Sequence, residues 1–293
     1  MVILHDPRCA EYGSAMRPEQ PARVIRSAAH LRSAHPEWTW RVPDETLATD
    51  DALLLAHTAA HLQRLAMTRD FDPDTPYLPD IPVHARRSVA AAIAAAKHAA
   101  SSPHHEPVFS LMRPPGHHAT ATRAMGFCYL NQIAVAALYA QKHLQAEKVA
   151  VWDFDAHHGN GTEAILQTRT RVFFASVHQY PGYPGTGTRD LGPTLRNWPV
   201  APHPPRPEHM AALRASLDAV QAFNPDLLLV SAGFDAYARD PITSMTLEAE
   251  DFATLGTWLG QLGRPAAALL EGGYHADLPL LIDAFLTAWN NAA

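Results

Sequence analysis

Short, wholly apolar runs alternate with longer helical stretches along most of this chain. A run such as Leu227–Val230 has no polar face, which is typical of a parallel strand that helices cover on both sides. Alternation of such strands with helices indicates βαβ units, and so predicts an α/β fold with one doubly wound, mostly parallel sheet. The strand candidates are Val2–Leu4, Val108–Met112, Lys148–Phe154, Val172–Val177, Asp226–Ser231 and Ala266–Leu270.

Helical stretches fill the intervals between these strands. Proline, at 25 residues, falls mainly outside both kinds of element, and neither a low-complexity linker nor an internal repeat interrupts them. We therefore expect one domain that comprises residues 1–293. The predicted helices are Pro21–Ala34, Ala48–Thr68, Val83–Ala100, Asn131–Leu144, Thr162–Gln167, Glu208–Ala222, Thr246–Leu262 and Leu278–Ala288.

Charge and composition narrow the classes of partner. A formal net charge of −6 argues against an electrostatic nucleic-acid binder. No apolar run reaches the roughly 18 residues of a membrane span, and the first residues lack the features of a signal peptide. Cys9 and Cys128 are too few for a disulfide framework, so we expect a reducing, cytoplasmic setting. The high content of Ala, Arg and Pro suggests a bacterial source.

Polar motifs stand directly after four of the strand candidates, at the strand ends where open α/β sheets bind ligands. After Val108–Met112, a Pro-Pro-Gly turn ends the strand and presents His117 and His118 side by side. Two adjacent imidazoles that point into one cavity can serve as a base and an acid. This motif alone is also compatible with a simple polar turn.

A second motif contains the residues that bind a metal ion most readily. Asp153, Asp155 and His157 alternate, so they share one face if the strand Lys148–Phe154 continues in extended form. Such charges at the end of a buried strand need compensation, which a divalent metal ion provides. Asp235, after the strand Asp226–Ser231, supplies a further carboxylate. One histidine and two carboxylates suit zinc with an open position for water, and Fe(II) would suit the same ligand types.

The fourth motif follows the strand Ala266–Leu270. Gly272 and Gly273 allow the backbone to approach the site closely, and Tyr274 then offers a phenol donor to a developing oxyanion.

Together these motifs resemble the zinc-dependent histone deacetylase family, which includes bacterial acetylpolyamine amidohydrolases. The resemblance covers most of the chain, because the stretches Arg17–Arg23, Gly126–Gln132 and Gln179–Gly187 are also similar to family motifs. It implies the arginase–deacetylase fold, with about eight strands in a central parallel sheet. It also implies the hydrolysis of an acetyl amide to acetate and a free amine.

The resemblance also implies roles for individual residues. Zinc would bind Asp155, His157 and Asp235, and Tyr274 would stabilise the oxyanion. His118 would act as general base and proton donor, with His117 as an electrostatic partner oriented by Asp153, although the sequence leaves this division open. The substrate tunnel would include Gly126, Phe127, Tyr183, Ile242 and Gly272. A structural K⁺ would bind Asp153 and the backbone carbonyls of Asp155, His157, Ser176 and Val177.

Three positions depart from the family pattern. Arg17 stands where the N-terminal motif usually has histidine, and Gln132 replaces the more usual Asn or Asp. Asn160 occupies a position where some relatives have Asp, so His118 would have a neutral partner, which alters its basicity.

The alternatives to a lysine deacetylase are another enzyme of the same fold, a non-catalytic binding module and a deacetylase with another substrate. A binuclear ureohydrolase of the same fold would need further carboxylates beside Asp235, where the chain has Ala236, Tyr237 and Ala238. A non-catalytic acyl-lysine binding module would be expected to lack one of the motif residues. An acetylpolyamine is the main alternative to an acetylated lysine peptide or protein. The stretch from Asp240 through Tyr274 resembles bacterial acetylpolyamine amidohydrolases, but the sequence favours lysine overall, because Ile242 is apolar and the segment between His61 and Val108 is short. Acyl length and oligomeric state stay open.

Overall fold

The computed structural model describes residues 1–293 and contains one sheet of eight strands, all of them parallel. The strand order is β2-β1-β3-β8-β7-β4-β5-β6, so β8, the last strand along the chain, lies near the middle of the sheet. This confirms the predicted doubly wound fold. The strands are β1 Val2–Leu4, β2 Thr39–Arg41, β3 Val108–Ser110, β4 Val149–Asp153, β5 Val172–Gln179, β6 Leu195–Val200, β7 Leu227–Ala232 and β8 Ala266–Leu270.

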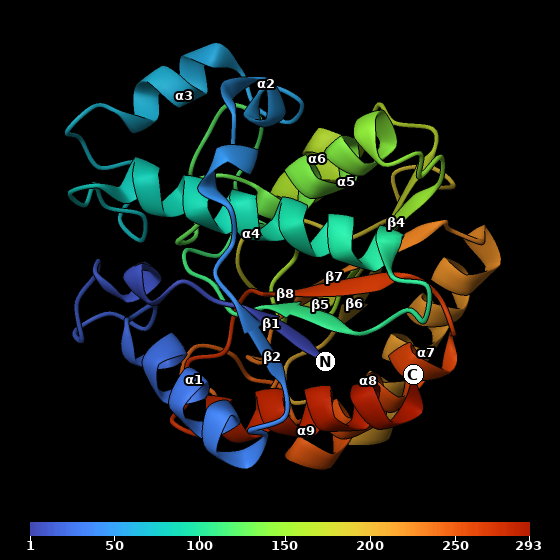
Figure 1. Ribbon diagram of the computed structural model, residues 1–293. Coiled ribbons are helices and arrows are strands. Elements are labelled where there is room, and N and C mark those ends of the chain that lie inside the picture. Colours follow the sequence, from blue (N-terminus) through green and yellow to red (C-terminus); the bar gives the residue numbers. More distant parts are fainter.

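Helices cover both faces of this sheet (Figure 1). One layer contains α1, α7, α8 and α9, and the opposite layer contains α4, α5 and α6. The helices are α1 Ala22–Ala34, α2 Asp50–Leu53, α3 Ala59–Leu65, α4 Ile81–Ser101, α5 Gln132–His143, α6 Asn160–Leu166, α7 Arg206–Phe223, α8 Ala249–Gln261 and α9 Leu278–Ala292, with 3-10 turns at Pro7–Ala10 and Glu45–Leu47.

The sheet divides the apolar interior into two cores, one on each face. In β4, Val149 and Val151 belong to the core under α4 and α5, whereas Ala150 and Trp152 belong to the core under α7 to α9. This alternation explains why the strands are apolar at every position. Each large side chain buried in this way contributes roughly 1.5–3 kcal/mol. The buried Trp152 also donates its indole N–H to Ser216 Oγ of α7 at 2.9 Å.

The predicted helix Ala48–Thr68 is wrong as a single element, because the chain forms α2 and α3 with a break between them. Thr58 is extended at this break, and its Oγ1 accepts a hydrogen bond from His61 N at 3.2 Å as the N-cap of α3. The neighbouring His57 accepts from Asn131 N at 2.9 Å. Local capping and a contact distant in sequence thus outweigh the helical periodicity.

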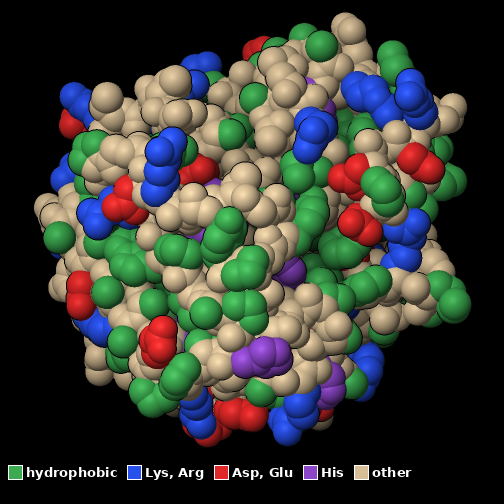
Figure 2. All heavy atoms as spheres, turned by 180° about the vertical axis from the view of Figure 1, so that it is seen from behind, with side chains coloured by type: hydrophobic (Ala, Val, Ile, Leu, Met, Phe, Trp, Pro, Cys, Tyr) green, Lys and Arg blue, Asp and Glu red, His purple; other side chains and the backbone are tan.

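None of the helices has the length and apolarity that crossing a bilayer requires. On the face in Figure 2, acidic and basic side chains are interspersed, and no continuous basic area gathers there.

Candidate active site

The four polar motifs predicted from the sequence follow β3, β8, β7 and β4, which are the four central strands of the sheet. Because all strands run parallel, their carboxyl ends lie at the same edge. The fold therefore brings the four motifs together, although the first, at His117, and the last, at Tyr274, lie more than 100 residues apart in sequence. This is the edge at which open α/β sheets bind ligands.

The three predicted metal ligands converge at this edge. The candidate ligand atoms of Asp155, His157 and Asp235 all lie within 4.8 Å of one another. His157 Nδ1 is 3.2 Å from Asp155 Oδ1 and 2.8 Å from Asp235 Oδ2. Both carboxylates are fully buried. Two carboxylates and one imidazole that point at one spot are a donor set for a divalent cation.

Backbone groups hold these carboxylates in place. Gly272 N donates to Asp155 Oδ2 at 2.7 Å, and Ala156 N donates to Asp235 Oδ1 at 2.8 Å. A Cβ at Gly233 would lie 2.1 Å from Asp155 Oδ2, so only glycine fits beside the carboxylates. The remaining carboxylate charge has no Lys or Arg partner within the site, which fits the metal predicted from the sequence.

His117 lies among carboxylates. Its Nδ1 is 3.1 Å from Asp153 Oδ2, and its Nε2 is 3.8 Å from Asp155 Oδ1. Burial works against protonation of the ring, but the negative charges of Asp155 and Asp153 outweigh it and raise the pKa of His117 well above its usual value. His117 is therefore the more cationic of the tandem pair.

His118 has the opposite environment. Its Nδ1 is 2.8 Å from Asn160 Oδ1, the neutral partner that the sequence predicted. Burial, together with the neighbouring His117 and His157, lowers the pKa of His118 well below its usual value. Since Asn160 Oδ1 can only accept, Nδ1 of His118 carries the hydrogen, and Nε2 keeps its lone pair.

Glu271 supports the tandem histidines and was missed by the sequence reasoning as a site residue. Its Oε2 accepts from Gly116 N at 2.7 Å and from His117 N at 3.2 Å, which fixes the turn after β3. Burial raises the pKa of Glu271 to about 7. Its position directly before Gly272 was the available signal, but its partners depend on the pairing of β8 with β3.

A cavity of about 270 Å³ leads from the surface to His118 and His157. Gly126 and Phe127, two predicted tunnel residues, both have positive φ angles of 57° and 66°. A Cβ at Gly126 would lie 2.6 Å from His118 Cδ2, so glycine allows the backbone to approach the imidazole. The cavity is lined by Arg17, Pro18, Asp74, His118, Gly126, Phe127, His157, Tyr183, Ile242 and Tyr274.

Tyr274 lines this cavity and is positioned by Asp240, a second residue missed from the sequence. Asp240 Oδ2 accepts from Tyr274 N at 2.8 Å, while its Oδ1 accepts from Ile242 N at 3.1 Å. Burial, with the charge of Asp235, raises the pKa of Asp240 to about 7. Burial also raises the pKa of the Tyr274 phenol, which stays protonated and can donate.

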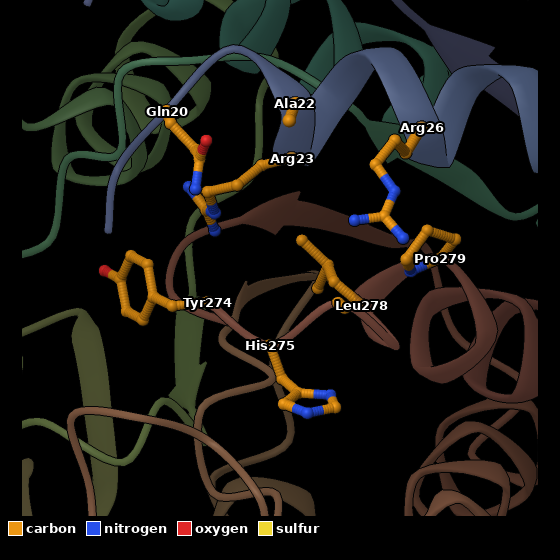
Figure 3. A pocket seen from close by; sticks show the side chains of 9 residues that line it. Gln20, Ala22, Arg23, Arg26, Tyr274, His275, Leu278 and Pro279 are labelled. Carbon is orange, nitrogen blue, oxygen red and sulfur yellow. The ribbon is translucent and has the colours of Figure 1, made fainter. Parts of the chain in front are cut away.

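Arg23 of α1 links the chain's first helix to the Tyr274 loop. Figure 3 shows its side chain extending from α1 towards this loop, beside a smaller cavity of about 140 Å³. Arg23 Nε donates to Gly273 O at 2.7 Å, and the guanidinium lies 4.8 Å from the centre of the Tyr274 ring. Glu19 binds both Arg23 and the buried Arg113, which directly precedes the turn with the tandem histidines.

The remaining predicted residues lie behind the ligands. Gly272, predicted as a tunnel residue, does not line the cavity, because its backbone faces the carboxylates, where a Cβ would lie 2.3 Å from Asp235 Oδ2. Ser176 pairs with Asp153 across β5 and β4, and Val177 follows it in the buried part of β5. These positions adjoin the predicted K⁺ site.

Comparisons with known proteins agree with this geometry. The sequence model of the family described as "Histone deacetylase domain" matches residues 17–288. The chain belongs to the histone deacetylase family. The family resemblance inferred from the motifs is therefore confirmed, and the activity of the family is that of a hydrolytic deacetylase.

Individual relatives match over nearly the whole chain. A "Probable deacetylase" of Methanothermobacter thermautotrophicus is 35% identical, with 94% of this chain and 86% of the relative covered. The "Histone deacetylase-like amidohydrolase" of Pseudomonas aeruginosa is 34% identical, with 90% and 73% covered. The crystal structure of acetylpolyamine aminohydrolase from Burkholderia pseudomallei has a TM-score of 0.88 and 26% identity, covering 100% of this chain and 99% of that one. The fold is thus that of the arginase–deacetylase proteins.

Proposed function

We propose that this protein is a zinc-dependent deacetylase that hydrolyses the Nε-acetyl amide of lysine. The observation that carries the proposal is the convergence of the His/Asp/Asp ligand set, the tandem histidines and Tyr274 on one cavity. When bound at Asp155, His157 and Asp235, the metal would polarise the amide carbonyl and lower the pKa of a water molecule. Fe(II) fits the same donors, and a K⁺ beside Asp153, Ser176 and Val177 would have a structural role.

The chain's own residues supply the proton transfers. His118 is the base, because its Nε2 keeps a lone pair while Nδ1 is held by Asn160. The same nitrogen then returns the proton to the departing amine. His117, cationic beside Asp153, balances the negative charge that develops during the reaction. Tyr274 lies on the same cavity with a protonated phenol and donates to the oxyanion.

The tunnel wall supports an acyl-lysine substrate. The rings of Phe127 and Tyr274 are 5.8 Å apart, and Tyr183 lies 5.1 Å from His118 in an edge arrangement. These apolar surfaces suit a methylene chain, and the Gly126 carbonyl would accept the amide N–H. Ile242, which is 37% exposed, offers no charge to the second amine of a polyamine, so in this cavity a carboxylate for that amine would come from Asp74. Acetylpolyamines present the same amide and are the second candidate substrate, favoured by the structural likeness to an acetylpolyamine aminohydrolase.

The test is a comparison of kcat/KM for the zinc-loaded protein on an acetyl-lysine peptide, N-acetylputrescine and N8-acetylspermidine. We expect a preference of tenfold or more for the peptide. A preference for either polyamine would overturn the assignment of lysine. Tyr274→Phe should lower kcat by about 10²–10³ because it removes one oxyanion donor. Full activity in that variant would contradict the proposed mechanism.

Metal analysis tests the ligand set independently of activity. After zinc loading and dialysis, we expect about one zinc per wild-type chain, because three ligand atoms converge there. Asp235→Asn should lose most of this zinc. Unchanged zinc content in the variant would show that the metal lies elsewhere.

A further inference from the structure

Two oppositely charged side chains flank the mouth of the substrate cavity. Arg17 is half-buried and Asp74 is exposed, and both line the same cavity as His157 and Tyr274. Because both side chains line the cavity of about 270 Å³ that also contains His118, one small molecule bound there can contact both charges. Arg17 is also one of the positions at which this chain departs from the family pattern.

Arg17 is held beside the loop that carries Asp74, but its charge is not neutralised there. Its Nη1 donates to Pro73 O at 3.3 Å, which is the only hydrogen bond of its side chain. No carboxylate lies within 4.0 Å of its guanidinium, so Nε and Nη2 remain available to a ligand. A guanidinium with two free donors at a cavity mouth suits a carboxylate.

Asp74 is likewise fixed in position and unpaired. Its backbone N–H donates to Asp72 Oδ1 at 3.0 Å, and the next residue, Thr75, accepts from Phe127 N at 3.0 Å. These contacts attach the loop to the tunnel wall. The Asp74 carboxylate itself accepts no hydrogen bond and forms no ion pair within the protein, so it can bind an ammonium group.

We propose that Arg17 and Asp74 recognise the free amino-acid end of Nε-acetyl-lysine, with Arg17 binding its α-carboxylate and Asp74 its α-ammonium. An amino acid carries these opposite charges on one carbon, and the mouth presents their complements on adjacent segments. An acetylated diamine has no carboxylate for Arg17, and a residue inside a peptide has neither charge. This inference rests on the proposed function and narrows its substrate to the free amino acid.

Three compounds separate the contributions of these charges. They are Nε-acetyl-L-lysine, N-acetylcadaverine, which lacks only the α-carboxylate, and acetyl-lysine capped at both ends, which has neither charge. We expect kcat/KM of the wild-type enzyme to be at least tenfold higher for the free amino acid than for either of the others. Because solvent-exposed charges are screened by salt, this preference should fall between low and high ionic strength.

Variants then assign the preference to residues. Arg17→Gln should reduce the ratio of kcat/KM for acetyl-lysine over N-acetylcadaverine to about two, and Arg17→Lys should give an intermediate ratio. Asp74→Asn should reduce the advantage of the free amino acid over the capped compound. Arg169→Gln is the matched control, since Arg169 is an exposed arginine beside a separate pocket, and it should leave all ratios unchanged.

The outcomes distinguish failure of the proposed recognition by Arg17 and Asp74 from failure of the proposed deacetylase function. Turnover of all three compounds at similar kcat/KM, or an unchanged ratio in Arg17→Gln, overturns the recognition of the amino-acid end and leaves the deacetylase function intact. A wild-type preference for N-acetylcadaverine or for the capped compound also overturns it, in favour of a diamine or a peptide. No turnover of the three compounds by a zinc-loaded enzyme that hydrolyses the acetyl-lysine peptide overturns this inference alone, whereas no turnover of the peptide either overturns the proposed function and this inference with it.

Discussion

His117 and His118 are neighbours in sequence with ring centres 4.1 Å apart, yet they have opposite electrostatic environments. His117 faces the carboxylate of Asp153, whereas His118 faces the amide of Asn160. The carboxylates near His117 raise the pKa of its imidazole. The neutral Asn160 beside His118 does not offset burial, which lowers the pKa of that imidazole. The pKa values of two identical side chains at one site are thus shifted in opposite directions.

This difference indicates how the pair divides its work. A base must be neutral before it takes a proton, and a group that balances developing negative charge must be cationic. The environments match His118 to the first role and His117 to the second. Changes to the histidines or to their partners should therefore have unequal effects.

The largest difference is expected between substitutions of the histidines themselves. His118→Gln should lower kcat by about 10³, because it removes the proton-transfer group, whereas His117→Gln should lower it by about 10². Single-turnover rates on the preferred acetylated substrate would measure both. A larger loss for His117→Gln would reverse the assignment of roles.

A smaller effect is expected when the charged partner of His117 is neutralised. Asp153→Asn should lower kcat/KM by about ten- to a hundredfold, since the carboxylate no longer favours the imidazolium form. Asp283→Asn is a matched control, because Asp283 also contacts histidines, His30 and His35, but far from the cavity. The kcat/KM of the control should stay within about twofold of the wild-type value. Equal losses of kcat/KM in the two variants would show that Asp153 has no specific role.

The smallest effect is expected from giving His118 the same kind of partner that His117 has. Asn160→Asp adds a carboxylate beside Nδ1, which stabilises the protonated ring and raises its pKa. Since His118 must be neutral to act as base, the acidic limb of the kcat/KM profile should move upward by about one pH unit. Activity should fall at the pH values around the acidic limb of the wild type and hardly change at alkaline pH.

The corresponding control is Asn291→Asp, at an exposed position close to the end of α9. It adds the same charge to the surface and should leave the pH profile unchanged. An acidic limb that stays in place or moves downward in Asn160→Asp would mean that His118 is not the titrating base.

Buried strands of the sheet were predictable from the sequence, but its edges were not. β1 and β8 match their predicted bounds, because strands with neighbours on both sides must be apolar throughout. The edge strands β2 and β6 lacked this signal. β6 contains Arg196, Asn197 and Pro199, and proline is tolerated because only one side of that strand is paired.

The site shows the same limit. Side chains directly after strands were predictable, since parallel strands end at a common edge. The contacts of Glu271 and Asp240 depend on which loops become neighbours, and that information is not local in sequence. The motif that contains Gly272 was located correctly from the sequence. The direction in which the backbone of Gly272 faces, towards the Asp155 carboxylate, could not be predicted.

The central position of β8 has a consequence for biosynthesis. Of the eight strands of this sheet, β8 is the last to leave the ribosome, yet it pairs with β3 on one side and β7 on the other. Until residues 266–270 emerge, a nascent chain that has formed its other strands exposes the unpaired edges of both neighbours. Such edges promote association between chains. Glu271 and Tyr274 directly follow this strand, so the insertion of β8 that closes the two edges also brings these residues into the site.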